Sequence, residues 1–252
     1  MARKLITKSI ILQGRNYGEA DKIMIAFTKD YGRIDFLARG VRKMKSKNRA
    51  LVQPFTYSEL EFIEGKNLDI LTQGVLIESF SHIRTDFDKI IECSYMAEYL
   101  IQVLQPHDPY EQLCYQFLWT LNYIDKKRPK NKIAMLAFLI KSFDVLGYAP
   151  LMDICLECGR SIEKHESFQY LVSEGSVACN QCSSGKGFFM NQEMVQLYRF
   201  LQTMDFKTAT LPTENNNLIK RMEQLVEKMM MQILEREHKS TAFLKKMKDL
   251  SI

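Results

Sequence analysis

Two pairs of cysteines constrain the fold of this chain more than any other feature of its sequence. Cys155 and Cys158 form one Cys-x-x-Cys motif, Cys179 and Cys182 form a second, and twenty residues separate the two motifs. This spacing lets both sulfurs of a pair face one ion, and four thiolates match the tetrahedral coordination of zinc in proteins. The sequence therefore predicts one structural zinc ion per chain.

Other uses of four cysteines fit less well. Disulfides need an oxidising compartment, and no part of the sequence resembles a signal peptide. A thioredoxin-like site uses one such motif beside a βαβ unit, whereas an iron–sulfur cluster stays open as an alternative. Four thiolates close the coordination shell, which favours support of folding over catalysis.

We find no P-loop, nucleophile elbow or His-Glu-x-x-His motif, so we expect no catalytic residues and no enzyme activity.

The first 80 residues have the pattern of short strands. Apolar, β-branched and aromatic clusters recur between turn-like breaks such as residues 14–18, 30–32 and 64–67. Five strands in this length suit a small barrel, and an OB-fold is the commonest barrel of this size that binds nucleic acid, although an SH3-like barrel would look similar. The predicted strands are residues 5–12, 22–28, 33–38, 55–63 and 68–77.

The apolar spacing becomes helical from Asp86 onward. The cysteine motifs interrupt this pattern, and a hairpin is predicted between them, with strands at residues 168–172 and 176–178. We therefore expect an α+β protein in which an OB-fold domain (residues 1–80) precedes an α-helical bundle domain (81–252) with a zinc-binding insertion (153–187). The predicted helices are residues 86–104, 110–127, 133–146, 192–204 and 218–234.

Positive charge is concentrated in the first third of the chain. The net charge is +5; residues 1–80 contain 14 Lys/Arg and 9 Asp/Glu, whereas residues 81–252 contain 21 of each. Residues 39–49 contain six cations and no acid. Such a loop favours a polyanion, because each phosphate contact releases condensed counterions; the alternative is a mobile, solvated connection. Four nearby aromatic residues are candidate stacking faces, although each also suits a barrel core: Tyr17, Tyr31, Phe36 and Phe55.

Several motifs together resemble the RecO family of recombination mediators. The resemblance spans the whole chain and is most specific in the first 80 residues and in the cysteine region. The motifs are Gly14–Lys22, Phe27-Thr28, Tyr31–Arg33, Ala38–Lys43, Gln53–Phe55, Glu78–Phe80, Leu146–Pro150 and Cys155–Gly159. Some family members lack the four cysteines, so the expectation of zinc depends on this sequence alone.

The resemblance implies a function that residue spacing cannot show. RecO proteins bind single- and double-stranded DNA, anneal complementary strands, engage the acidic C-terminal tail of single-stranded DNA-binding protein and, with RecR, help to load RecA. Arg33, Arg39, Arg42 and Lys43 match the family's basic barrel positions. Charge alone extends the predicted DNA-binding set to Lys45, Lys47 and Arg49.

The remaining expectations concern partners and location. A basic cluster at Lys126, Lys127, Arg128, Lys130 and Lys132 is a candidate site for the acidic tail, although a solvated loop explains it equally well. We expect a cytoplasmic, nucleoid-associated protein that is monomeric alone and does not bind membranes. The rival functions are an RNA-binding protein of translation or RNA processing and a nucleic-acid-modifying enzyme without a familiar motif.

Overall fold

Alternation of buried and outward residues builds the strands of the N-terminal barrel. In β3 (Gly32–Ala38), Ile34, Phe36 and Ala38 are buried, whereas the residues between them are half-buried, as the two-residue period of a strand requires. The strands pair in the order β1-β2-β3-β5-β4 and close into a barrel, with β3 and β5 parallel. The other strands are β1 (Lys4–Tyr17), β2 (Asp21–Thr28), β4 (Tyr57–Ile63) and β5 (Asp69–Glu78).

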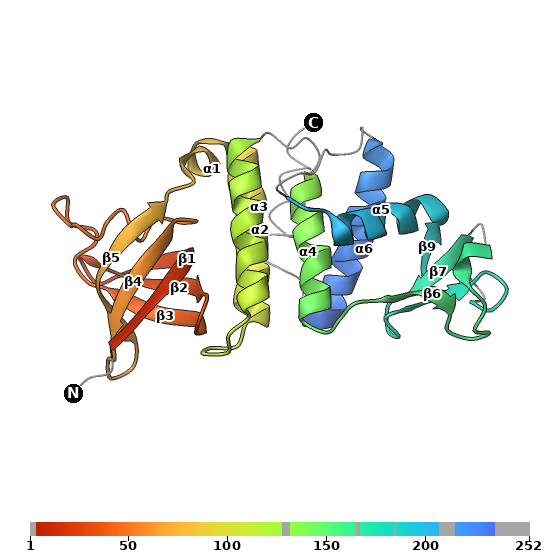
Figure 1. Cartoon of the computed structure of the whole chain (residues 1–252), viewed down its shortest axis with the longest axis horizontal. Helices are drawn as coiled ribbons and strands as arrows, with labels where there is room; N and C mark the ends of the chain where they lie inside the picture. Colours follow the sequence, from red (N-terminus) through yellow and green to blue (C-terminus); the bar gives the residue numbers. More distant parts are fainter. Residues whose placement is uncertain (1–3, 128–131, 165–166, 184, 207–214, 235–252) are drawn as a thin grey trace. The chain divides into compact units, whose positions relative to one another are not determined.

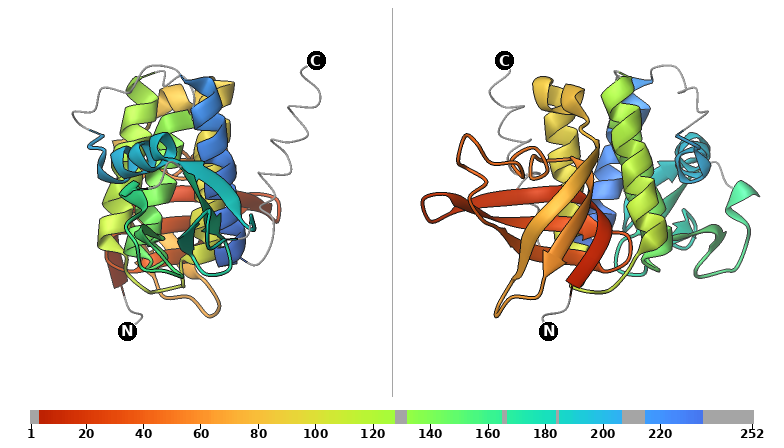
Figure 2. Two further views of the ribbon diagram at one scale, coloured as in Figure 1. Left: turned by 90° about the vertical axis from the view of Figure 1, so that its right-hand side faces the viewer. Right: turned by 60° about the vertical axis from the view of Figure 1, so that its left-hand side comes forward.

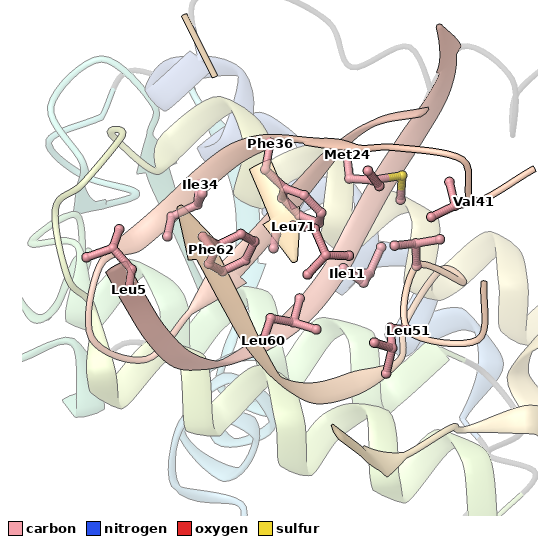
Figure 3. Packing of buried hydrophobic residues seen from close by; sticks show 13 residues of the cluster. Leu5, Ile11, Met24, Ile34, Phe36, Val41, Leu51, Leu60, Phe62 and Leu71 are labelled. Atoms are coloured by element: carbon pink, nitrogen blue, oxygen red, sulfur yellow. The ribbon is translucent and has the colours of Figure 1, made fainter. Parts of the chain in front are cut away.

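The interior of the barrel is filled by apolar side chains from every strand (Figure 3). Phe36 and Phe62 are fully buried and meet edge to face, with ring centroids 5.0 Å apart. This arrangement is favourable because the positive edge of one ring meets the negative face of the other. The closed five-stranded barrel confirms the predicted OB-type architecture.

The first strand is longer than predicted. Residues 14–18 have the composition of a turn, but β1 continues to Tyr17 and pairs with β2 as far as Asp21. Residues 13–19 are exposed, so this ribbon lacks the cluster of apolar residues that identified the rest of the strand. The ribbon extends past the body of the barrel (Figure 2, right).

Three helices complete the first compact unit, which the computed structural model describes for residues 4–127. Asp86 caps α2 by accepting hydrogen bonds from the backbone N–H groups of Asp88 and Lys89. The α2–α3 connection returns to the barrel at Gly32, which has φ of 62°; a Cβ there would lie 1.9 Å from the Asp108 carbonyl oxygen. Only glycine fits this approach. The helices are α1 (Ser81–Thr85), α2 (Phe87–Val103) and α3 (Glu111–Lys126).

The second compact unit is described for residues 132–164, 167–183, 185–206 and 215–234. It combines three helices with a sheet of order β6-β8-β7-β9 (Figure 1). Lys141 of α4 donates to the Gln202 carbonyl of α5 at 2.8 Å, which joins these two helices. The elements are α4 (Ile133–Val145), β6 (Leu151–Cys155), a 3₁₀ turn (Ile162–Lys164), β7 (Ser167–Leu171), β8 (Ser176–Cys179), β9 (Phe188–Asn191), α5 (Gln192–Thr203) and α6 (Asn216–Leu234).

The α+β class and the hairpin between the cysteine motifs are confirmed, since β7 and β8 pair antiparallel. The structure adds α1, β6 and β9, which are too short to show a periodic pattern. The domain limits of 1–80, 81–252 and 153–187 stay a prediction. No helix among the described residues has both the length and the apolar character needed to cross a membrane.

Candidate metal centre and basic surface

The four cysteines of the two motifs converge on one point. Their sulfur atoms all lie within 4.8 Å of one another. Cys155 ends β6 and Cys179 ends β8, and each strand leads into a turn that carries the second cysteine of its motif. Cys155 and Cys179 are buried, Cys182 is half-buried and Cys158 is exposed. The sheet therefore fixes one sulfur of each pair, and the following turn returns the other toward it.

Backbone hydrogen bonds shape both turns. The Gly159 N–H donates to the Cys155 carbonyl at 2.9 Å, and the Cys182 and Ser183 N–H groups donate to the Cys179 carbonyl at 3.0 and 2.9 Å. Gly159 has φ of 68°, a conformation that glycine adopts without a steric penalty. The Cys179 N–H also donates to the Cys155 sulfur at 3.3 Å. This last donor favours negative charge on the Cys155 sulfur, as a metal-binding thiolate requires.

The ionisation of the thiols indicates why a cation suits this site. Burial opposes ionisation of Cys155, but hydrogen bonds from the backbone of Cys158, Cys179 and Glu157 outweigh it and lower the pKa to about 6. Hydrogen bonding to Cys179, together with desolvation, raises the pKa of Cys182 to about 12. One thiolate therefore forms readily, whereas a crowded neighbour keeps its proton. A bound cation would remove this conflict by neutralising all the thiolates together.

The ligand set fits a closed, tetrahedral metal site. Each ligand atom of the group is a cysteine sulfur, and soft thiolates select zinc or iron rather than magnesium or calcium. The described residues can therefore hold one metal ion, and a complete shell of four protein ligands leaves no position for a substrate.

The basic segment, residues 39–49, connects β3 toward β4 as a series of tight turns. Lys43, Ser46, Arg49 and Leu51 each donate a backbone N–H to the carbonyl three residues earlier, at 3.1 to 3.3 Å. At its start, the Gly40 N–H donates to the Asp21 carboxylate at 2.7 Å. The segment is therefore an ordered structure rather than the unconstrained connection that composition also allowed.

Apolar residues anchor this segment to the barrel. Val41, Leu51 and Val52 are buried within the barrel cluster, and Figure 3 shows Val41 and Leu51 near Ile11. The Phe55 N–H donates to the Ile11 carbonyl at 2.8 Å, which brings the chain back to β1. The segment and the residues after it thus close one end of the barrel and direct the intervening cations outward.

Six of the seven predicted DNA-binding residues belong to the basic segment. Arg39, Arg42, Lys43, Lys45, Lys47 and Arg49 are all exposed. Within the described residues none of the six forms an ion pair; the guanidinium of Arg42 donates to the Gly18 carbonyl at 3.0 Å. Their positive charge is therefore not neutralised by acids of the described structure.

Arg33 has a different environment. Its guanidinium makes two 2.8 Å hydrogen bonds to Asp35 and a third to the Ile101 carbonyl of α2, and its side chain is 21% exposed. The hydrogen bond to Asp35 raises the pKa of Arg33. These contacts join the barrel to the helices that follow it. The role of Arg33 as a phosphate ligand stays a prediction.

Replacement of Arg33 by glutamine is expected to lower the free energy of unfolding by about 2 kcal/mol, because charged hydrogen bonds to Asp35 and Ile101 are lost. DNA affinity should change by less than about twofold. Arg39→Gln, which removes an exposed cation, should leave stability unchanged but weaken binding about fivefold at 0.1 M salt. Urea unfolding and fluorescence anisotropy measure the two effects. The reverse pattern would show that Arg33 binds phosphate.

The β1–β2 ribbon also contributes to the surface around the basic segment, although its sequence has the composition of a turn. The Arg42 N–H donates to the Ala20 carbonyl at 3.0 Å, so the ribbon tip lies against the basic segment. Arg15 on the ribbon is exposed, and Tyr17 is 55% exposed. Phe36 and Phe55 are buried core residues, and Tyr31 packs against the core. Of these four aromatic residues, Tyr17 is the one suited to stack on a base.

The predicted tail-binding cluster is only partly described. Arg128 and Lys130 lie outside the described residues. Lys126 and Lys127 are exposed, with the Lys127 amine 4.8 Å from the ring centroid of Tyr123. Lys132 pairs with Glu223 at 3.3 Å. The assignment of this cluster to an acidic tail stays a prediction.

Comparisons with known proteins cover nearly the whole chain. The family model for the recombination protein O N-terminal region matches residues 1–80, and the model for its C-terminal region matches residues 84–242. The DNA repair protein RecO of Desulfitobacterium hafniense is 34% identical over 176 residues, which is 70% of this chain and 63% of that protein. The matched part thus spans less than two thirds of that relative.

Two further relatives align over more of their length. The DNA repair protein RecO of Thermodesulfovibrio yellowstonii is 30% identical over 231 residues, covering 88% of this chain and 90% of that protein. That of Caldanaerobacter subterraneus subsp. tengcongensis is 26% identical over 250 residues, covering 98% of this chain and the whole of that protein. The family models and these relatives, together with the barrel and the cysteine cluster, show that this chain belongs to the RecO family.

Proposed function

We propose that this chain is a mediator of DNA repair and homologous recombination that binds single- and double-stranded DNA and anneals complementary strands. The observation that carries this proposal is the anchored basic segment, which exposes six cations without acidic partners in the described structure. Phosphate contacts of this kind bind DNA without regard to sequence. Annealing requires binding that is independent of sequence, because the protein must hold both complementary strands whatever their sequence.

No bond is made or broken in the proposed activity. Two single strands repel each other through their phosphates, and a cationic surface that screens this repulsion raises the rate at which complementary bases meet. The exposed Tyr17, on the ribbon beside the basic segment, is positioned to stack on an unpaired base, a contact that every base permits. We therefore assign no residue a catalytic role.

The metal has a structural role in this proposal. One Zn²⁺ per chain would be held by Cys155, Cys158, Cys179 and Cys182, fixing the turns at the ends of β6 and β8. The further partners, namely RecR, the C-terminal tail of single-stranded DNA-binding protein and RecA at the loading step, rest on the family. So does the location in the cytoplasm at the nucleoid.

A strand-annealing assay tests the proposal. Fluorescent complementary oligonucleotides should anneal at least about tenfold faster with the protein at 0.1 M salt, because screening accelerates the encounter. The acceleration should persist when the strands are coated with single-stranded DNA-binding protein. Equal rates with and without this chain, on bare strands at protein concentrations that saturate them, would contradict the proposal.

The RNA-binding alternative has its own discriminating result. An OB-type barrel and a four-cysteine motif occur both in proteins that bind DNA and in proteins that bind RNA. Competition between DNA and RNA oligonucleotides of the same sequence separates the two functions. Preference for RNA by about tenfold or more would favour a role in RNA metabolism.

A further inference from the structure

One seam of the barrel is only partly closed. β5 pairs with β4 along its length, but its pairing with β3 is limited to Phe36 with Asp69 and Leu37 with Ile70. On that side of β5, beyond Ile70, no further backbone-to-backbone hydrogen bond occurs among the described residues. The Asn48 amide donates to the Thr72 carbonyl at 3.1 Å, at the start of this edge. Residues 73–77 therefore present a free strand edge.

This edge carries apolar side chains. Val75, Leu76 and Ile77 are 65%, 40% and 47% exposed. Proteins usually protect a free edge with lysine, proline or a covering element, but residues 71–77 contain neither lysine nor proline. A free edge with consecutive aliphatic residues favours pairing with another strand.

The charges at the two ends of the edge are opposite. Lys47 and Arg49 flank Asn48 and therefore lie beside Thr72 at one end; both are exposed. Glu78 is exposed at the other end, where its carboxylate accepts the Ser79 N–H at 2.9 Å. Neither these cations nor Glu78 form ion pairs within the described structure. When two copies of this edge run antiparallel, the positive end of each therefore lies beside the negative end of the other.

We propose that a second copy of this chain pairs its β5 edge antiparallel with this one, about a two-fold axis at Val75. In this register Gly74 lies opposite the partner's Leu76, and the partner's Glu78 lies just past the paired residues, beside the Asn48 amide that bonds Thr72. The partner's carboxylate then approaches Lys47 and Arg49, and the symmetry repeats the contact on the other side of the axis. An interface of this kind, in which the same patch serves both copies, is the usual one in two-fold dimers.

The dimer should be weak. A stable interface buries about 1,200–2,000 Å² in total, and one free strand edge, residues 73–77, supplies less. We expect a dissociation constant of about 10–100 µM, so the chain stays monomeric at nanomolar concentration. The dimer would carry two basic segments related by the axis, one for each strand to be annealed. This consequence rests on the proposed DNA binding, whereas the pairing of the edges does not.

Cysteine crosslinking tests the pairing at its axis. With Val75→Cys in the metal-loaded full chain at 100 µM, oxidised glutathione should convert most of the protein to a disulfide-linked dimer. Ile6→Cys, on the outer face of β1 and 52% exposed, is the matched control and should give less than about a tenth as much. The wild-type chain measures the background from its own cysteines. Equal yields from Val75→Cys and Ile6→Cys would overturn the proposal.

A charge exchange tests the register. By sedimentation velocity, Glu78→Lys alone and the pair Lys47→Glu with Arg49→Glu should each weaken dimerisation about tenfold or more. Combining all three substitutions should restore it, because opposite charges face each other again. Failure to recover would exclude the register centred on Val75. The DNA affinity of reduced Val75→Cys is measured at nanomolar protein, where the chain is monomeric. It therefore tests the proposed DNA binding separately from the pairing of the edges.

Discussion

The Cys179→Ser variant is expected to lose its metal and to unfold the second compact unit. Cys179 is fully buried at the end of β8. Zinc binding by four-ligand peptides contributes about 10–16 kcal/mol of apparent free energy, which matches or exceeds the total stability of about 5–15 kcal/mol of a typical protein. Removing one thiolate should therefore reduce zinc from one ion per chain to nearly none and make the sheet β6-β8-β7-β9 sensitive to protease.

Elemental analysis and limited proteolysis measure these two effects. Cys114→Ala is the matched control, because Cys114 is also a buried cysteine but belongs to α3; it should keep its metal. Zinc should also be released as the pH falls, because protons compete for the thiolates. One zinc ion per chain in purified Cys179→Ser, with unchanged protease resistance, would contradict the structural role. Iron in the wild-type protein in place of zinc would identify a cluster instead.

Neutralising four cations of the basic segment should have the second largest effect. In the variant with glutamine at Arg42, Lys43, Lys45 and Lys47, the affinity for single-stranded DNA at 0.1 M salt should fall about 10²–10³-fold. Each lost phosphate contact removes about 0.7 from the slope of log affinity against log salt for single strands. The slope should therefore become shallower by about 2 to 3. Anisotropy titrations at several salt concentrations give both quantities.

The control for this variant has the same change in charge elsewhere. Lys66, Lys186, Lys220 and Lys228 are exposed lysines outside the basic segment, and their replacement by glutamine should reduce affinity by less than about fivefold. Because the anchoring residues Val41 and Leu51 are unchanged in both variants, thermal unfolding should be nearly the same. Equal losses of affinity in the two variants would show that overall charge, rather than the basic segment, determines binding.

The sequence predicted those parts of the fold whose pattern is local. Apolar, β-branched and aromatic clusters between turn-like breaks identified the barrel strands, and the helical spacing of apolar residues placed α2 to α6 within a few residues of their ends. The two Cys-x-x-Cys motifs predicted a shared site because the chemistry of thiolates needs no other information. The β1–β2 ribbon was missed because its residues from Gln13 onward are polar and exposed.

The remaining features depend on contacts between distant residues. Arg33 resembles its basic neighbours in sequence, and only the folded chain places it against the Ile101 carbonyl. Tyr17 and Phe36 are both aromatic residues near cations, yet one is exposed and the other buried. Composition cannot separate them, because their environments are set by which strand face reaches the barrel interior. The free edge of β5 likewise becomes visible only when the partners of every strand are known.

The anchoring of the basic segment has an evolutionary consequence. Its attachment relies on a few buried apolar positions, Val41, Leu51 and Val52, while the exposed side chains between them pack against little. Substitutions at these outward positions should therefore cost little stability. Natural selection can adjust the number of cations here to the salinity of a cell's interior while the barrel that presents them stays intact.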